Sequence, residues 1–589
     1  HVNIADSARI TTAAPAGNSG TWLIDPVNFT VAASGGDITG AALGSNLGAG
    51  NVVIQSSSGA TGTAGDVNVN DAVSWSANQL TLNAQNNINI NANLNASGTG
   101  KLALEYGQGT ASGIGNSYNL NNGAKVNLPA GNNFSTKQGS TGTTTAYTVI
   151  TSLGAAGSTT GTDLQGISGN LNGRYAMGAD IDASSTSTWN SGSGFQPLGN
   201  NTSQFTGTLD GLGHTITGLT INRTGTDYVG LFGYTGTFGR INNLGLVGGS
   251  VSGQTKVGAL AGWNSGNITN SYASTAVTGT GSEAGGLVGT SQGEIRNSHA
   301  SGAVSGGLAV GGLVGWNQSL ISDSYATGNV TATGQWSGGL VGYMLNQGAI
   351  SGSYASGNVT STSADVGGLV GWWASNATAA AAITNSYATG AVTGTDHVGG
   401  LVGYKIQTLG VINNSYAAGA VSGSTNVGGL VGLWEAGAGI NNSFWDVTTT
   451  GRATSSGGGM GMTTAQMQQQ ANFNSATAAN GNVNPNWDFT SVWRIYEGNS
   501  RPLLKALMKA TTVTVGNTSK TYDKLAWNGG TGISCSNVAC SSLLGSVSFG
   551  GPAQGAVNAG SYTLTGSGLY SNQQGYDISY ASGTLTINP

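Results

Sequence analysis

The feature that most constrains the fold is a short apolar phrase that recurs through the middle of the chain with glycines on both sides. Its commonest form is Gly-Leu-Val-Gly, as at Gly312–Gly315, and successive copies lie 26 to 32 residues apart. A unit shorter than about 35 residues that is repeated this often predicts a solenoid, in which each unit stacks on the next. The leucines of the copies are Leu260, Leu287, Leu313, Leu340, Leu369, Leu401 and Leu430, with a more distant copy at Leu231.

Residue type decides between helical and β repeats. Each unit contains two more short phrases, of the types Asn-Ser-Tyr-Ala and Ala-Val-Thr-Gly, and is rich in Gly, Val, Thr, Ser, Asn and Tyr. These residues are poor helix formers, and the apolar positions alternate as they do in strands. We therefore predict an all-β protein, a right-handed parallel β-helix whose leucines fall in the same inward position on every coil, about 4.8 Å apart.

Aromatic residues also recur in register. One set follows the leucine phrase, and we predict that it forms a structural ladder, with a row of exposed sugar-stacking platforms as the alternative. This set is Trp263, Trp316, Tyr343, Trp372 and Tyr404. A second ladder is predicted from the Asn-Ser-Tyr-Ala phrase, with His299 in the same register: Tyr272, Tyr325, Tyr354, Tyr387, Tyr416 and Phe444.

These coils resemble the GLUG motif of large bacterial surface proteins and exoproteins. The resemblance covers about 231–445. The segments GRYAMGADIDAS (173–184) and FTGTLDGLGHTITGLTINR (205–223) are similar to the lead-in of such proteins, and NWDFTSVWRIYEGNSRPLL (486–504) is similar to their closing segment. The resemblance implies a β-helix at a cell surface and says little about chemistry.

The two ends of the chain carry other resemblances. GTWLIDPVNFTV (20–31), GDVNVNDAVSW (65–75) and the alternating stretch 80–94 resemble filamentous-haemagglutinin-like exoproteins, which implies export by two-partner secretion. TTVTVGNTSKTYDKLAWNG (511–529) and the final stretch 560–589 resemble MBG-type modules, which implies a small antiparallel β-sandwich after the helix. The expected domains are haemagglutinin-like coils (1–134), a lead-in (135–224), the GLUG coils with their closing segment (225–505) and the sandwich (506–589).

Composition excludes several classes of partner. The net charge is -5, charged residues make up 7% of the chain, and Lys and Arg form no run. The electrostatic footprint of a nucleic-acid-binding or anionic-membrane-binding protein is therefore missing. No apolar run approaches the roughly 20 residues of a membrane helix, so we predict no membrane insertion.

The two cysteines, Cys535 and Cys540, are close in sequence. We predict a disulfide between them, with reduced thiols as the alternative; two thiolates alone do not complete a metal site. A disulfide would place the protein in an oxidising, extracellular compartment. No metal or cofactor is predicted.

An enzymatic reading rests on four residues, Asp180, Asp182, Asp210 and His214. Parallel β-helices also serve polysaccharide-cleaving enzymes, in which two carboxylates supply the acid and the base. In this chain the same residues suit turn capping or cation binding, so we expect no catalysis.

The sequence therefore predicts a secreted, surface-exposed adhesin or structural stalk of a Gram-negative bacterium. Its expected partners are a glycan, a host or neighbour-cell surface protein, or further copies of itself. The alternatives are a filament subunit joined by strand addition and a polysaccharide-cleaving enzyme.

Overall fold

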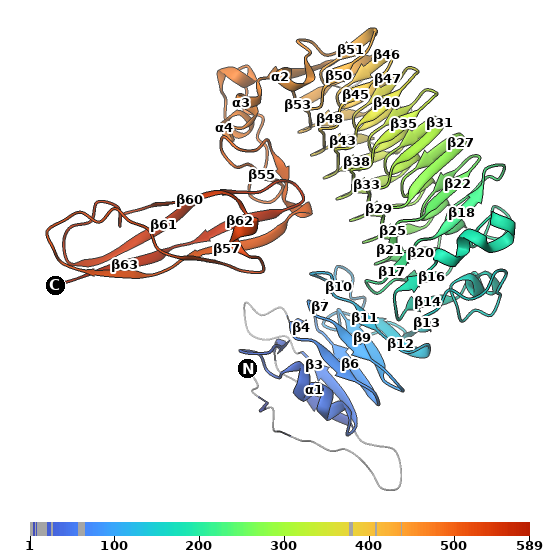
Figure 1. Ribbon diagram of the computed structural model, residues 1–589, viewed down its shortest axis with the longest axis horizontal. Helices are drawn as coiled ribbons and strands as arrows, with labels where there is room; N and C mark the ends of the chain where they lie inside the picture. Colours follow the sequence, from blue (N-terminus) through green and yellow to red (C-terminus); the bar gives the residue numbers. More distant parts are fainter. Residues whose placement is uncertain are drawn as a thin grey trace.

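A computed structural model describes residues 4–5, 8, 21–24, 27–56, 65–375, 381–406, 409–436 and 439–589. The protein is all-β, with 46% of residues in strands and 8% in helices, and its main body is a β-solenoid of about 14 turns. The prediction of a parallel β-solenoid is thus confirmed. Figure 1 shows the stack of coils, with the C-terminal module lying to one side of it.

The N-terminal coils form three sheets of parallel strands around one apolar core, and the first of these continues into the central coils. Helix α1 (Gly40–Leu47) begins at the N-cap Thr39, whose side chain accepts from the Ala42 N–H, and it packs against β5. The first sheet contains β1 (Thr21–Ile24), β3 (Asn51–Gln55), β6 (Gln79–Asn83), β9 (Lys101–Tyr106) and β12 (Gly131–Gln138). The other two contain β2 (Phe29–Val31), β4 (Val67–Val69), β7 (Ile88–Ile90) and β10 (Tyr118–Leu120), and β5 (Val73–Trp75), β8 (Leu94–Ala96) and β11 (Val126–Asn127).

The chain then reverses direction in a hairpin. Strand β12 pairs antiparallel with β13 (Thr145–Ile150), and β13 pairs parallel with β14 (Arg174–Met177). The expected domain boundary at 134/135 therefore falls inside β12, and the Ser/Thr/Gly-rich stretch after it is the turn of this hairpin. The N-terminal and central coils are two stacks that meet at an antiparallel junction (Figure 1).

The central coils stack five columns of strands, and neighbours within each column are parallel. The first column, which has isoleucines inside, contains β16 (Thr208–Asp210), β20 (Arg240–Asn242), β25 (Asn267–Thr269), β29 (Ile295–Arg296), β33 (Leu320–Ser322), β38 (Ala349–Ser351), β43 (Ala382–Thr384), β48 (Val411–Asn413) and β53 (Ile440–Asp446). The second, after β15 (Ile181–Asp182), contains β17 (Thr215–Thr217), β21 (Gly245–Val247), β26 (Tyr272–Ala273), β30 (His299–Ala300), β34 (Tyr325–Ala326), β39 (Tyr354–Ala355), β44 (Tyr387–Ala388) and β49 (Tyr416–Ala417).

The other three columns close each coil. The third contains β18 (Thr220–Arg223), β22 (Ser250–Gly253), β27 (Ala276–Gly285), β31 (Val304–Gly311), β35 (Val330–Ala332), β40 (Val359–Ser361), β45 (Val392–Thr393) and β50 (Val421–Ser422). The fourth contains β23 (Val257–Gly258), the C-terminal ends of the long strands β27 and β31, β36 (Ser337–Gly338), β41 (Val366–Gly367), β46 (Asp396–Gly399) and β51 (Thr425–Gly428). The fifth contains β19 (Phe232–Thr235), β24 (Ala261–Asn264), β28 (Val288–Ser291), β32 (Val314–Asn317), β37 (Val341–Leu345), β42 (Val370–Ala374), β47 (Val402–Ile406) and β52 (Val431–Trp434).

The repeated glycines allow this close stacking. A Cβ added at Gly312 would lie 2.1 Å from the carbonyl oxygen of Gly339 in the next coil and 2.9 Å from the Ala326 Cβ. Backbone atoms cannot move aside as a flexible side chain can, so the position accepts only glycine.

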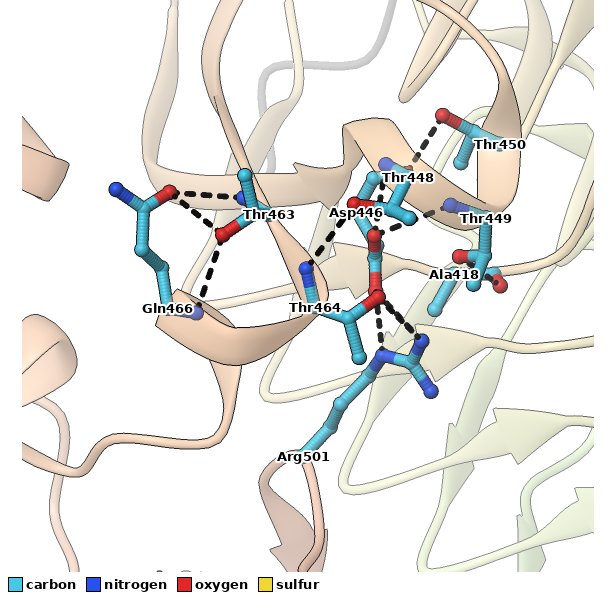
Figure 2. Close-up of polar contacts among 9 residues, drawn as sticks. All are labelled: Ala418, Asp446, Thr448, Thr449, Thr450, Thr463, Thr464, Gln466 and Arg501. Atoms are coloured by element: carbon cyan, nitrogen blue, oxygen red, sulfur yellow. Dashed lines mark hydrogen bonds and ion pairs between the residues drawn. The ribbon is translucent and has the colours of Figure 1, made fainter. Parts of the chain in front are cut away.

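A buried acidic residue fastens the last coil to the closing segment (Figure 2). Asp446 is fully buried at the end of β53, and its Oδ1 accepts from the N–H groups of Thr448 and Thr449 at the start of α2 (Val447–Thr450). Its Oδ2 accepts from Thr464 Oγ1 at 2.7 Å and from Arg501 Nε at 2.8 Å. Burial by itself raises the pKa of Asp446, but these hydrogen bonds and the charge of Arg501 outweigh it and lower that pKa.

The closing segment folds back over the side of the solenoid. The sequence predicts one helix over 463–471, and the structure instead has α3 (Thr464–Met467), with a capping box from Thr463, and a separate α4 (Ala471–Asn474). The short strands β54 (Gly458–Met462), β55 (Trp493–Arg494) and β56 (Leu503–Leu504) complete it.

The C-terminal module differs from the predicted antiparallel sandwich, because each of its two small sheets mixes parallel and antiparallel pairs. Strand β57 (Lys509–Val515) is parallel to β62 (Tyr576–Ala581) and antiparallel to β59 (Ile533–Cys535). In the other sheet β58 (Thr518–Thr521) is parallel to β63 (Gly583–Asn588), whereas β63, β61 (Gly560–Tyr570) and β60 (Leu544–Gly550) are antiparallel. The first two strands of the module run beside its last two in the same direction, which a pattern of local turn signals does not reveal.

Candidate functional site

The predicted leucines lie in one internal column. All seven are fully buried, and the main-chain N–H of each leucine from Leu260 to Leu401 donates to the carbonyl oxygen of the leucine in the next coil at 2.8–2.9 Å. A parallel column of isoleucines, which the sequence analysis missed, is buried beside it: Ile241, Ile268, Ile295, Ile321, Ile350, Ile383 and Ile412. The sequence does contain a signal for this column. In each coil an isoleucine lies two positions before the turn residue, usually Asn, that has the left-handed conformation, as Ile268 does before Asn270.

Three members of the first aromatic set, Trp316, Tyr343 and Trp372, lie outside the main core in a separate cluster. Tyr343 stacks between Trp316, at 5.2 Å between ring centroids, and Trp372, at 4.6 Å. Trp336, which the sequence analysis missed, stacks on Trp372 at 4.6 Å. Thr290 occupies the ladder position between Trp263 and Trp316, so the ladder is interrupted there.

The remaining members of that set have other neighbours. Trp263 stacks on Tyr234 of the preceding coil, with 5.5 Å between ring centroids. The Tyr404 ring stacks on His397 at 4.5 Å. Trp316, Trp372 and Tyr404 are each only partly buried, so one side of this cluster faces outward.

The second aromatic set stacks almost without a break. Ring centroids of successive members from Tyr272 to Tyr416, including His299, lie 4.4–5.0 Å apart and the planes differ by 3–8°. Phe444 continues the register and contacts Phe473 of the closing segment. Burial between the neighbouring rings lowers the pKa of His299 to about 4, so this imidazole is neutral in the folded protein at pH 7.

The two cysteines are joined in a disulfide. The Cα atoms of Cys535 and Cys540 lie 5.4 Å apart, and the bond closes the turn between β59 and β60.

Three of the four candidate polar residues contact the N-terminal coils, and two of them, Asp180 and His214, also contact each other, with 3.2 Å between Asp180 Oδ1 and His214 Nδ1. Asp180 accepts from Lys125 Nζ at 2.6 Å and from the Thr215 N–H at 2.9 Å. The Nε2 of the buried His214 lies 2.9 Å from the Val126 carbonyl oxygen, which makes that nitrogen the donor. Lys125 and Val126 belong to the N-terminal coils, so these contacts fasten the two stacks of coils together at their junction.

The other two acids are also engaged. Asp210 is fully buried and accepts hydrogen bonds from Tyr118 of the N-terminal coils, from Asn243 and from the Leu212 N–H. Burial raises the pKa of Asp210. Asp182 is exposed, and its Oδ1 accepts a hydrogen bond from the Ser184 N–H in the following turn. That hydrogen bond lowers the pKa of Asp182. Among the described residues, none of these three carboxylates is hydrogen-bonded to another of them.

The junction between the two stacks contains a cleft of about 710 Å³. Tyr106 and Tyr118 line it from the N-terminal coils, Tyr147 from β13, and Arg174 and Arg240 from the central coils. Most of its other lining groups are amides and hydroxyls: Asn116, Ser117, Thr136, Gln138, Thr143, Thr145, Asn172, Thr206, Thr208, Asn242, Asn243, Thr269 and Asn270.

The cleft has an aromatic rim and a cationic character. Phe238, in the turn between β19 and β20, is 77% exposed and lines it. The buried Asp210 lies behind Tyr118, and the guanidinium groups of Arg174 and Arg240 are exposed. Burial, together with repulsion from Tyr147 and Asp210 in their ionised forms, raises the pKa of Tyr106 to about 12, so its hydroxyl stays protonated at pH 7.

This cleft was not predicted from the sequence, because its walls come from segments more than a hundred residues apart. The sequence does contain one signal, the apolar residue Phe238 in a turn that is otherwise polar. The equivalent turns of the next three coils contain Ser265–Gly266, Gln292–Gly293 and Gln318–Ser319. Within the described ranges there is no group of three or more His, Cys, Asp or Glu side chains that could hold a metal ion. In the same part of the chain no helix has the length and apolar character needed to cross a membrane.

Comparison with known proteins identifies the central repeats. Residues 280–305 and 306–331 each match the GLUG motif. A stretch of 125 residues, 20% of the chain, is 47% identical to halomucin of Haloquadratum walsbyi, and 82 residues, 13% of the chain, are 44% identical to a protein of Evansella cellulosilytica provisionally assigned as a Gly-rich membrane protein. The matches span only 1% and 10% of these relatives' lengths.

Among solved structures, the chain is similar to a Bacteroides ovatus protein provisionally assigned as an immunoglobulin A1 protease. The sequences are 20% identical, the TM-score is 0.33, and the match covers 61% of this chain and 93% of the other. The chain described here is a β-solenoid protein whose central coils carry GLUG motifs.

Proposed function

We propose that this protein is a surface-exposed contact protein, an adhesin or stalk, that acts by binding and not by turnover. The observation that supports it best is a long stack of coils with an open polar cleft at its junction, in which the nearby acidic groups are already bound within the protein. Halomucin and the Gly-rich membrane protein, by their names, are consistent with a place at the cell surface.

The absence of turnover is part of the proposal, and the geometry of the acids supports it. Glycoside hydrolysis needs two carboxyl groups facing one bond, about 5 to 9 Å apart. Asp210 is enclosed by Tyr118, Asn243 and a main-chain N–H, whereas Asp180 is held by Lys125. Each carboxylate therefore serves the junction between the coils.

The proposal also includes the route to the surface and the nature of the C-terminal module. The resemblance of residues 20–31, which lie partly outside the described residues, and of 65–94 to filamentous-haemagglutinin-like proteins supports export by two-partner secretion. The phrasing of 511–529 supports an MBG-type module, and the disulfide of that module suits an oxidising extracellular location.

The test is a binding assay and a cleavage assay on the same purified chain. We expect binding to glycans on an array or to intact cells, and no release of reducing ends or unsaturated uronates from polysaccharides. Asp182→Asn is the matched control for Asp210→Asn, because Asp182 is exposed and away from the cleft lining. Cleavage that Asp210→Asn abolishes and Asp182→Asn preserves would contradict the non-catalytic proposal, and failure to bind any glycan or cell would contradict the contact function.

A further inference from the structure

Two arginines of the junction cleft, Arg174 and Arg240, have guanidinium groups that no described residue pairs with. Of the residues that the structure describes, none forms a side-chain hydrogen bond or an ion pair with the guanidinium of Arg174 or Arg240. Both side chains are exposed on the cleft wall. The chain has a net charge of -5 and only 17 Lys and Arg residues in all, so two unpaired cations in one cleft are an unusual concentration of positive charge.

The sheet fixes the separation of these arginines. Arg174 pairs in register with Thr208, and Thr208 pairs with Arg240, so the two arginines are two strands apart on the same side of the sheet. With neighbouring strands about 4.8 Å apart, their Cα atoms lie about 10 Å from each other. An extended ligand could therefore meet both cations along the coil axis.

The position is specific to the junction. The coil after Arg240 has Asn267 in this register, and the next has Glu294, which pairs with Arg296 on its own strand. The exposed Phe238 beside Arg240 also has no equivalent in those coils. The cationic aromatic corner is thus a local feature and not a property of the repeat.

Neutral groups around the arginines suit the hydroxyls of a sugar. The Asn242 amide oxygen accepts from Thr269 at 2.6 Å, which leaves its NH₂ group available toward the cleft. Tyr106 and Phe238 supply aromatic surfaces of the kind on which sugar rings stack, and the rest of the wall is mainly amide and hydroxyl. An acidic peptide would require apolar pockets for its other side chains, and the cleft has few apolar lining residues.

We propose that the junction cleft binds an anionic saccharide, with Arg174 and Arg240 each taking a carboxylate or sulfate group and Phe238 stacking on a ring. Guanidinium forms two parallel hydrogen bonds with either group, which selects for planar or tetrahedral oxyanions over neutral hydroxyls. The inference rests on the proposed contact function and assigns its ligand class and site.

The experiment measures binding of the full chain to paired ligands that differ only in charge. A galacturonate oligosaccharide is compared with its methyl ester, and a sulfated dextran oligosaccharide with unmodified dextran; poly-aspartate is the peptide arm. Arg174→Met and Arg240→Met are expected to weaken binding of the charged saccharide by about 10- to 100-fold each, since each removes a charge-assisted contact. Arg296→Met, on the same sheet but beyond the cleft, is the matched control and should bind normally.

Each outcome decides the proposal. Arginine-dependent binding of the galacturonate or of the sulfated dextran supports it and identifies which anion is preferred. Three results would overturn it. The methyl ester could bind as tightly as the free galacturonate, or the variant with both arginines replaced could bind the charged saccharides as tightly as the unaltered chain. The third is that poly-aspartate alone binds in an arginine-dependent way. Neutral glycans that still bind the double variant would leave the contact function standing without this site, whereas loss of binding to every glycan and cell by the unaltered chain would refute both.

Discussion

Replacement of Gly312 by alanine tests whether the repeated glycines are required by the distance between coils. The added Cβ would lie 2.1 Å from the Gly339 carbonyl oxygen, whereas ordinary contacts lie at 3.4–4 Å. The two coils must therefore separate by more than an ångström, or their main-chain hydrogen bonds must bend. One of those at stake is the 3.2 Å bond from the Gly312 N–H to the Gly338 carbonyl.

The magnitude follows from these contacts. Overpacking costs about 1–3 kcal/mol, and each weakened main-chain hydrogen bond adds about 1 kcal/mol. Alanine also lowers the entropy of the unfolded chain, which stabilises the folded state by about 0.4–1 kcal/mol. We expect a net loss of about 2–4 kcal/mol in the free energy of opening of the affected coils.

The assay is native-state hydrogen exchange, because each coil contacts only its neighbours and unfolding is expected to be local. Gly225→Ala is the matched control, since an added Cβ there meets nothing within 4 Å. Faster exchange should appear in peptides covering Gly312 and Gly339 and should fade within a few coils. If the Gly312 and Gly225 variants exchange equally, the steric explanation of the repeated glycines is refuted.

Three further predictions test other parts of the structure. The pKa of His299 falls from 6.5 in the unfolded chain to about 4 in the folded protein, so between these pH values the unfolded state binds the extra proton. His299 should therefore lower the free energy of unfolding by about 2 kcal/mol, after solvent screening, as pH falls from 6.5 to 4. Chemical denaturation across this range should show a steeper decrease for the unaltered chain than for His299→Tyr, and parallel curves would contradict the prediction. Under denaturing conditions the mass should rise by two hydrogen atoms when Cys535 and Cys540 are reduced, with a loss of about 2 kcal/mol confined to the C-terminal module, and two free thiols before reduction would disprove the bond. Arg501→Met should leave the buried carboxylate of Asp446 without its charged partner at a cost of about 3–5 kcal/mol, seen as faster proteolysis of 463–504, and unchanged proteolysis would argue against the role of this pair.

The repeat determined the fold of the central coils directly. A parallel solenoid places like residues on like residues, so spacing alone put the leucines from Leu260 to Leu430 in one column. The spacing of the repeats also predicted the second aromatic ladder, from Tyr272 to Phe444. The predicted first ladder was less accurate, because Thr290 interrupts the series and Trp336, from the turn directly before β36, joins the stack.

Only the tertiary structure decided what happens where the repeat stops. The direction of the chain reverses between β12 and β13, and this reversal brings Lys125 to Asp180 and Tyr118 to Asp210. The C-terminal module likewise pairs strands whose partner residues are 67 positions apart in sequence, as Lys509 and Tyr576 are. Periodicity reports contacts between equivalent positions of neighbouring coils, whereas the cleft with Arg174 is formed by non-equivalent segments whose meeting depends on chain direction and packing at the junction.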